Sequence, residues 1–216
     1  MRKELITIVD YGLSNIFSIR NAIESLGYKT KITSKSQTID KAEVLVLPGV
    51  GSFPAAIKRI NKLKIKKSIK NFIASGKPFL GICLGFQLLF QKSYEFGISK
   101  GLGILKGEVK IFSKKKINKS KLHIGWNKLK LNKKFKIHNK KLIYQLKNNF
   151  YYFVHSYHVI PKDKNIVSFT SNFKGEHFCS GILKNNIFAL QFHPEKSGIQ
   201  GLKMLKIFLK NEIQKK

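Results

Sequence analysis

Short apolar runs alternate along the chain with segments whose apolar residues recur every three or four positions. The runs at residues 5–9 and 44–47 predict strands that are buried on both faces of a sheet. The periodic segment at residues 16–26 predicts a helix, with Ser14 as its N-cap and Gly27 at its C-terminal end. Strands that alternate with helices in this way favour a parallel sheet.

The same alternation continues through the first half of the chain. Residues 28–33 predict a second strand, and residues 57–69 predict an amphipathic helix with lysines on its solvated face. The apolar stretch at 77–90 predicts a strand, a glycine-rich turn and two to three turns of helix. Glycines at intervals through residues 101–112 indicate a change to β structure.

The second half of the chain is predicted to be rich in β structure. The elements expected there are strands at 150–155, 166–170, 177–183 and 187–192 and a final helix at 200–213. We therefore predict an α/β fold with a doubly wound, mostly parallel central sheet flanked by helices. We expect the additional β structure of the second half to complete the same sheet, and residues 1–216 to form a single domain.

The composition fits a folded α/β protein. Of the 216 residues, 43% are hydrophobic and 12% aromatic, enough to bury a core. The formal net charge of +31 would by itself favour a nucleic-acid or anionic-membrane binder. The excess is nearly all lysine spread along the chain, with arginine only at Arg2, Arg20 and Arg59. Because arginine is the residue suited to bidentate phosphate and base contacts, we expect no specific nucleic-acid binding.

The use of cysteine indicates a reducing compartment. Cys83 and Cys179 make no disulfide framework, and no Cys/His cluster has zinc-site spacing, so we expect neither a metal nor a cofactor. Residues 1–10 contain too short an apolar run for a signal peptide, and no run is long enough to cross a bilayer. We predict a cytoplasmic protein with no membrane partner. Cys179 is expected to be a small buried hydrophobic residue.

Candidate chemistry begins at Cys83. Residues 81–85 read Gly-Ile-Cys-Leu-Gly and lie where the predicted strand turns into the predicted helix. Glycines two residues before and after a nucleophile allow the sharp turn that exposes it, as in the Gly-x-Ser-x-Gly elbow of hydrolases. A thiol at a helix N-terminus is also favoured as thiolate. The pentapeptide alone fits a buried cysteine in a glycine-rich turn equally well.

His193 offers a base for such a thiol. It follows the predicted strand 187–192 and begins the sequence His-Pro-Glu, in which Pro194 stiffens the backbone and Glu195 is within reach of the imidazole. A lone histidine after a strand is more often a surface or packed residue. In a chain that also carries the Cys83 elbow, the pattern favours a Cys-His-Glu triad.

Six short segments carry a resemblance to one class of enzyme. Three resemble the class I (triad) glutamine amidotransferases: Pro-Gly-Val-Gly at 48–51, Gly-Ile-Cys-Leu-Gly-Phe-Gln at 81–87 and Gln-Phe-His-Pro-Glu-Lys-Ser at 191–197. Three are similar, more narrowly, to the glutaminase subunit of imidazole glycerol phosphate synthase: Asp-Tyr-Gly-Leu-Ser-Asn at 10–15, Gly-Trp-Asn at 125–127 and Phe-Val-His-Ser-Tyr at 153–157. The resemblance therefore covers essentially the whole chain.

The resemblance implies a catalytic or binding role for each matched position. Cys83 would attack the side-chain amide of glutamine to form a thioester, His193 would transfer the protons, and Glu195 would orient His193. The backbone N–H groups of Val50 and Leu84 would stabilise the oxyanion, a contribution of roughly 3–4 kcal/mol for each donor. The residues implied to hold the amino-acid end of glutamine are Gly51, Gln87, Ser156 and Tyr157. Gln87 could equally be a helix-surface residue, and residues 156–157 a strand end.

The resemblance also implies a partner. Free ammonia is largely protonated near neutral pH, so glutaminases of this class pass it through the protein to a synthase. The implied function is a glutaminase subunit that forms a heterodimer with a cyclase subunit of (β/α)8-barrel type and channels ammonia to it in histidine biosynthesis. Asn15, Trp126 and Tyr152 occupy positions implied to lie near that interface. Trp126 could equally be an ordinary core aromatic residue.

Some positions depart from the family pattern. Ile124 stands where methionine is more familiar before Gly-Trp-Asn, Ser14 stands where glycine is common, and His158 follows Tyr157. These features also suit close relatives that supply ammonia to a sugar-amidating synthetase in surface polysaccharide biosynthesis. That acceptor is the first alternative, and a basic nucleic-acid-associated protein on the same scaffold is the alternative from another class.

Overall fold

The computed structural model describes residues 5–113, 121–132 and 149–213. Residues 1–4 and much of the lysine-rich stretch 113–149 lie outside the described residues. Within the described ranges, no helix combines the length and the apolar character needed to span a membrane.

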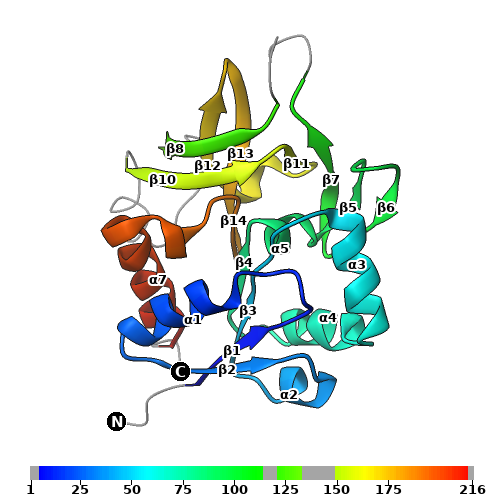
Figure 1. Ribbon diagram of the computed structural model, residues 1–216, viewed down its shortest axis with the longest axis vertical. Helices are drawn as coiled ribbons and strands as arrows, with labels where there is room; N and C mark the ends of the chain where they lie inside the picture. The colour runs from blue at the N-terminus through cyan, green and yellow to red at the C-terminus, as the bar shows by residue number, and fades with distance from the viewer. Residues whose placement is uncertain (1–4, 114–120, 133–148, 214–216) are drawn as a thin grey trace.

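A sheet of eight strands, in the order β2-β1-β3-β4-β14-β13-β12-β9, forms the centre of the molecule (Figure 1). Its strands are β1 (Leu5–Val9), β2 (Lys29–Thr33), β3 (Val44–Leu47), β4 (Phe79–Ile82), β9 (Lys130–Leu131), β12 (Val167–Phe173), β13 (Glu176–Lys184) and β14 (Ile187–Leu190). The first five in this order are parallel to one another, and the last three continue the sheet in antiparallel pairing. The predicted mostly parallel α/β sheet is confirmed.

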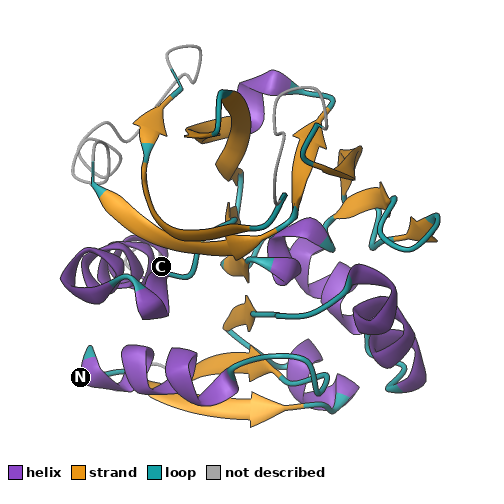
Figure 2. Cartoon of the chain, turned by 45° about the horizontal axis from the view of Figure 1, so that its top comes forward, coloured by secondary structure: helices purple, strands orange, loops and turns teal. Residues whose placement is uncertain are grey.

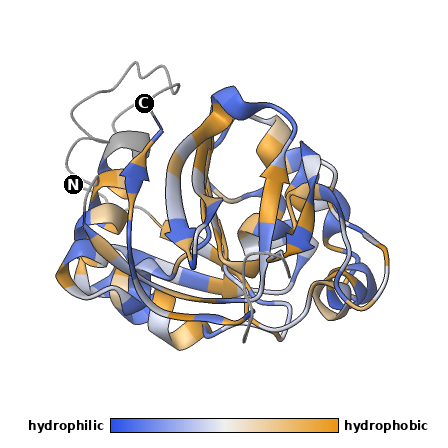
Figure 3. Cartoon of the chain, turned by 90° about the horizontal axis from the view of Figure 1, so that it is seen from above, coloured by the Kyte–Doolittle hydropathy of each residue, from blue (hydrophilic) through white to orange (hydrophobic). Residues whose placement is uncertain are grey.

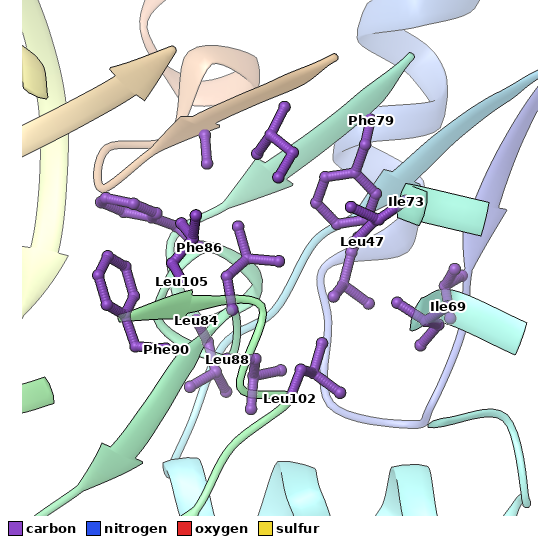
Figure 4. Packing of buried hydrophobic residues seen from close by; sticks show 14 of the residues in the cluster. Leu47, Ile69, Ile73, Phe79, Leu84, Phe86, Leu88, Phe90, Leu102 and Leu105 are labelled. Carbon is purple, nitrogen blue, oxygen red and sulfur yellow. The ribbon is translucent and has the colours of Figure 1, made fainter. Parts of the chain in front are cut away.

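Helices cover both faces of this sheet (Figure 2). On one face, α1 (Ile16–Ser25) and α7 (Gly198–Ile213) pack in a hydrophobic cluster with Ile6 and Ile8 of β1. On the other face lie α3 (Phe53–Lys62) and α4 (Lys66–Ala74), in a cluster that includes Leu47 of β3 (Figure 4). Figure 3 shows hydrophobic and hydrophilic residues interleaved along the helices, as expected for helices with one buried side. Because both faces of the sheet are covered, its parallel strands are apolar throughout.

Part of the second half forms two smaller sheets, so the expectation of one continuous sheet was wrong. β10 (Phe150–His155) pairs antiparallel with β8 (His123–Lys128). A separate four-stranded sheet has the order β11-β7-β5-β6. Its strands are β5 (Phe90–Ser93), β6 (Ser99–Lys100), β7 (Leu105–Ile111) and β11 (Tyr157–Pro161). In β8 and β10 buried residues alternate with more exposed ones, which marks strands with only one covered face.

Before Cys83, the helices differ from the prediction in three places. The single helix expected at 57–69 is two helices, because Lys64 has a positive φ of 56° and ends α3 before α4 begins. α2 (Ser36–Asp40) was not predicted. The N-cap of α1 is Asn15, whose side chain accepts a hydrogen bond from the backbone N–H of Ser18, and Ser14 precedes it.

The helix predicted to follow Cys83 is also shorter than expected. α5 (Leu84–Gln87) ends after one turn, and the chain continues as β5. The carbonyls of Leu88, Leu89 and Phe90 accept hydrogen bonds from backbone N–H groups of residues 102–105. These tertiary bonds take the place of the helical bonds that the apolar pattern predicted.

Candidate active site

Four predicted motifs meet at one edge of the central sheet. Strands β1, β3, β4 and β14 are parallel, so their carboxyl ends lie side by side. The chain leaves these ends in the segments 10–15, 48–52, 83–85 and 191–195. Such an edge is where ligand sites of α/β proteins lie. The topology therefore brings together motifs that are far apart in the sequence.

Cys83 lies in a strained turn between β4 and α5. Its backbone has φ 52° and ψ −108°, a conformation that residues with a side chain rarely adopt. Its N–H donates to the Leu190 carbonyl at 2.7 Å, which ties the turn to the end of β14. The turn has the shape expected of a nucleophile elbow. Because α5 has only four residues, the expected helix-dipole contribution to a thiolate is small.

Gly85 lets this turn pack against the end of β3. A Cβ atom at residue 85 would lie 1.8 Å from the carbonyl oxygen of Leu47. We expect Gly85→Ala to lower the free energy of unfolding by about 3 kcal/mol, measured by chemical denaturation. Gly81→Ala is the matched control, since its Cβ would meet no atom closer than 3.3 Å, and it should cost much less. Wild-type stability of Gly85→Ala would contradict this packing.

His193 and Glu195 are buried side by side. Nδ1 of His193 lies 2.7 Å from Oε1 of Glu195, with both side chains less than 5% exposed. The His193 backbone is fixed as well: its N–H donates to the Tyr152 carbonyl at 2.9 Å, and its carbonyl accepts from the Ser197 hydroxyl at 2.6 Å. The other ring nitrogen, Nε2, is buried and makes no hydrogen bond with the described residues. It is the nitrogen free to exchange a proton.

The charge of His193 depends on Cys83. Burial alone lowers the pKa of an imidazole, but the neighbouring Cys83 and then the carboxylate of Glu195 outweigh burial and raise the pKa of His193 to about 10. An imidazolium beside a thiolate is the form in which a Cys-His pair is ready for nucleophilic attack. The structure therefore brings Cys83, His193 and Glu195 together as the sequence predicted.

Two other buried histidines near the site are poor candidates for the base. Nδ1 of His123 lies 3.2 Å from Nε2 of His155, and Nδ1 of His155 lies 2.9 Å from the Tyr157 carbonyl. Burial lowers the pKa of His123 to about 4, and burial together with His123 lowers the pKa of His155. Both imidazoles are neutral near pH 7, so they serve as packed, hydrogen-bonded residues.

The expected oxyanion donors are occupied by backbone carbonyls. The N–H of Leu84 donates to the Gly49 carbonyl at 3.3 Å, and the N–H of Val50 donates to the Leu13 carbonyl at 2.9 Å. The Gly49 carbonyl and the Val50 N–H belong to the same peptide group. That peptide would have to turn over before both N–H groups could face a substrate oxygen. In the structure, neither N–H group is free to bind a substrate oxygen.

Several polar groups of the residues implied to hold glutamine bond within the protein. Gln87 is buried, so its helix-surface interpretation was wrong. Its amide nitrogen donates to the Tyr157 carbonyl at 2.8 Å and to Oε1 of Gln191 at 3.1 Å. Gln191 in turn donates to Sγ of Cys83 at 3.8 Å. The backbone carbonyl of Ser156 accepts a hydrogen bond from the N–H of Phe112. Gly51 is exposed and has a positive φ of 90°.

Three residues of this site were not predicted from the sequence: Glu95, Gln191 and Tyr11. Oε2 of Glu95 accepts the N–H of Phe53 at 2.7 Å, next to the 48–52 loop. Partial burial raises the pKa of Glu95, and its charge helps to raise the pKa of Tyr157. A carboxylate here could face the ammonium group of an amino acid. Glu95 is one of only 11 acidic residues in the chain, and that scarcity was the one available signal.

Trp126 is on the surface, so its interpretation as a core residue was wrong. Its side chain is 56% exposed, and it pairs across the β8–β10 ladder with Tyr152. We call the outward face of this ladder the outer strip. It consists of Ile124, Trp126 and Lys128 of β8 and Phe150, Tyr152 and Val154 of β10. The strip borders the site, because Sγ of Cys83 lies 3.9 Å from the Val154 carbonyl. Asn15, the third expected interface residue, is exposed at the start of α1.

Cys179 is chemically unlike Cys83. Burial raises the pKa of Cys179 to about 12, so this thiol stays protonated at neutral pH. It lines a cavity of about 430 Å³ between β11, β12 and β13. None of the expected site residues lines that cavity. Cys179 therefore remains a small buried residue, as predicted, and the cavity is separate from the Cys83 site.

Comparisons with known proteins show the family to which this chain belongs. The family model for glutamine amidotransferase class-I matches residues 7–211. The imidazole glycerol phosphate synthase subunit HisH of Aquifex aeolicus is 45% identical over 202 residues, which cover 93% of this chain and 94% of the relative. The chloroplastic imidazole glycerol phosphate synthase hisHF of Arabidopsis thaliana is 42% identical over 207 residues, or 95% of this chain and 34% of the plant protein.

A solved structure supports the fold independently. PurLQS from Thermotoga maritima matches with a TM-score of 0.74 at 22% sequence identity, covering 97% of this chain and 99% of that chain. At this identity the match concerns the fold alone.

Proposed function

The chain belongs to the class-I glutamine amidotransferases, with the HisH subunits of imidazole glycerol phosphate synthase among its relatives, and we propose that it is the glutaminase subunit of such a synthase. It hydrolyses glutamine to glutamate and ammonia, and the ammonia passes to a cyclase subunit in histidine biosynthesis. The observation that carries the proposal is the buried His193–Glu195 pair, 2.7 Å apart, beside the strained Cys83.

The proposed reaction uses the three side chains in order. The Cys83 thiolate attacks the amide carbon of glutamine, and the resulting tetrahedral intermediate collapses to a γ-glutamyl thioester. His193 gives its Nε2 proton to the departing nitrogen, which leaves as ammonia. It then takes a proton from the water that hydrolyses the thioester to glutamate. Glu195 holds the Nδ1 side of the imidazole and stabilises its positive charge.

We propose that the resting loop keeps this reaction slow until a partner binds. The Leu84 N–H donates its hydrogen bond to the Gly49 carbonyl, so it is not available to a developing oxyanion. The oxyanion would instead face the carbonyl oxygen, which repels it. Turning the Gly49–Val50 peptide frees the Leu84 N–H and presents the Val50 N–H. Each donor gained is typically worth roughly 3 kcal/mol in the transition state. Gly51, Gln87, Ser156 and Tyr157 are proposed to hold the amino-acid end of glutamine next to this loop.

The outer strip is proposed as the docking surface for the cyclase subunit. It presents exposed apolar side chains of Ile124, Trp126 and Phe150 on one face. Because its Val154 lies beside Cys83, ammonia formed at the thiol is released just behind this surface. Asn15 at the start of α1 is proposed to contact the same partner. We propose a partner of (β/α)8-barrel type, and the name hisHF of the longer plant relative supports a joint function of two parts.

Trp126→Ala is expected to weaken partner binding by about tenfold or more, because exposed tryptophans are frequent hot spots of interfaces. The dissociation constant can be measured by calorimetry with the cyclase subunit. Ile98→Ala is the matched control, since Ile98 is 73% exposed in the β5–β6 turn, away from β8 and β10 (Figure 1). Equal affinities of wild type and Trp126→Ala would exclude Trp126 from the interface.

We also propose that the protein works in the cytoplasm. Cys83 and Cys179 are both free thiols in the structure. Unpaired cysteines are typical of proteins in reducing compartments.

The proposed function is tested by measuring glutamate and ammonia from glutamine, with the chain alone and with the cyclase subunit that copurifies with it. We expect slow turnover alone and a large increase with the partner. Copurification of a sugar-amidating synthetase would support the alternative acceptor. Absence of glutamine hydrolysis in every combination, with DNA or RNA binding that survives physiological salt, would favour the nucleic-acid alternative.

A further inference from the structure

The hydroxyl of Tyr11 is a buried polar group that the mechanism leaves unused. Tyr11 lies two residues beyond the end of β1, is 1% exposed, and its hydroxyl makes no hydrogen bond with the described residues. Burial raises the pKa of Tyr11, so the hydroxyl keeps its proton and remains a donor. Buried polar groups are nearly always hydrogen-bonded, so an unpartnered one in a site indicates a state in which it gains a partner.

This hydroxyl lies against the Gly49–Val50 peptide, whose present orientation keeps the Val50 and Leu84 N–H groups bonded to backbone carbonyls. A Cβ atom at Gly49 would lie 1.9 Å from the Tyr11 oxygen and 3.0 Å from Cβ of Leu84. Only glycine at position 49 allows the hydroxyl to come this close to the backbone. Leu84 directly follows Cys83, so the hydroxyl and the Gly49 backbone meet next to the turn that carries the reacting sulfur.

The loop at residues 10–15, which contains Tyr11, also bonds the other end of the Gly49–Val50 peptide. The Leu13 carbonyl, two residues after Tyr11, accepts the Val50 N–H at 2.9 Å. The loop itself is fixed, because the Gly12 N–H donates to Oδ1 of Asp10 at 2.8 Å. When the Gly49–Val50 peptide turns, the Gly49 carbonyl loses the Leu84 N–H and needs another donor. The Tyr11 hydroxyl is an unused donor beside it.

We propose that Tyr11 is a positioning residue for the glutaminase reaction, whose hydroxyl donates to the Gly49 carbonyl after the Gly49–Val50 peptide has turned. This hydrogen bond holds the peptide in the orientation that presents the Val50 and Leu84 N–H groups to the oxyanion. The loop at 10–15 therefore stabilises both states, through Leu13 at rest and through Tyr11 in the active form. The inference rests on the proposed glutaminase function.

Tyr11→Phe tests the inference by removing only the hydroxyl. We expect kcat for glutamine hydrolysis by the chain alone to fall about tenfold with KM unchanged, as for one lost hydrogen bond in the active state. With saturating partner the loss should be equal or smaller, because the partner also favours the turned peptide. The rate of Cys83 alkylation by iodoacetamide, which needs no oxyanion hole, should stay at the wild-type value. Thermal stability should not fall, because the hydroxyl has no partner at rest.

Tyr151→Phe is the matched control, since Tyr151 is a fully buried tyrosine whose hydroxyl bonds the side chain of Asn149. It should lower stability and leave kcat unchanged. Wild-type kcat in Tyr11→Phe overturns the inference, and so does an equal loss of alkylation rate, which would show damage to the thiolate. If the wild-type protein hydrolyses no glutamine even with its partner, the proposed function fails before Tyr11 is tested.

Discussion

Replacing Cys83 by alanine is expected to abolish glutamine hydrolysis, with a loss of roughly 10⁴-fold or more in kcat. The thioester route requires a sulfur at this position, and the other thiol of the chain cannot replace it. Cys179 lies in a separate part of the fold, and burial raises its pKa to about 12. The rate is measured as glutamate release in the presence of the partner subunit, so that the wild-type rate is high.

Cys179→Ala is the matched control for this experiment. It removes the same functional group from a buried site and should keep the wild-type rate. A Cys83→Ala protein that still hydrolyses glutamine at a tenth of the wild-type rate would exclude Cys83 as the nucleophile. Far-UV circular dichroism of both variants shows whether the fold is retained.

His193→Gln is expected to reduce kcat by roughly 10³-fold, because the variant loses both the proton carrier and the positive charge beside the sulfur. The wild-type imidazole keeps its proton through neutral pH, since Cys83 and Glu195 raise the pKa of His193 to about 10. A neutral amide cannot pair with a thiolate in this way. Alkylation of Cys83 by iodoacetamide at pH 7 should therefore slow together with turnover.

The neutral histidine of the neighbouring network provides the comparison. His123→Gln alters a buried imidazole whose pKa burial lowers to about 4, and it should leave the alkylation rate of Cys83 near the wild-type value. Wild-type alkylation in His193→Gln would show that the imidazole does not support the thiolate. In that case the pairing of Cys83 with His193 would be wrong.

The central sheet could be predicted because its strands are recognisable from the sequence alone. Residues 44–47 are apolar throughout, and the structure places them as β3 with both faces covered. The errors arose where tertiary contacts override local pattern. The apolar residues after Gln87 could continue a helix, yet their carbonyls bond to residues 102–105 and the chain becomes β5. Lys64 gives no signal in the sequence for the positive φ that separates α3 from α4.

The triad could be predicted because each member belongs to a motif at the carboxyl end of a parallel strand. Cys83 follows β4, and His193 and Glu195 follow β14, the neighbouring strand in the sheet. The orientation of the Gly49–Val50 peptide could not be predicted, because the sequence is the same whichever way the peptide faces. Glu95 and Tyr11 were missed since neither stands in a motif whose chemistry is evident without the fold.

Covalent labelling with a diazoketone analogue of glutamine tests the central claim most directly. The carbon that carries the diazo group is protonated and then alkylates the catalytic sulfur with loss of N2, and peptide mass spectrometry identifies the modified residue. We predict one label per chain, on Cys83, with loss of glutaminase activity in proportion to labelling and protection by glutamine. Labelling of another residue in step with inactivation, while Cys83 stays unmodified, would contradict the assignment of this site.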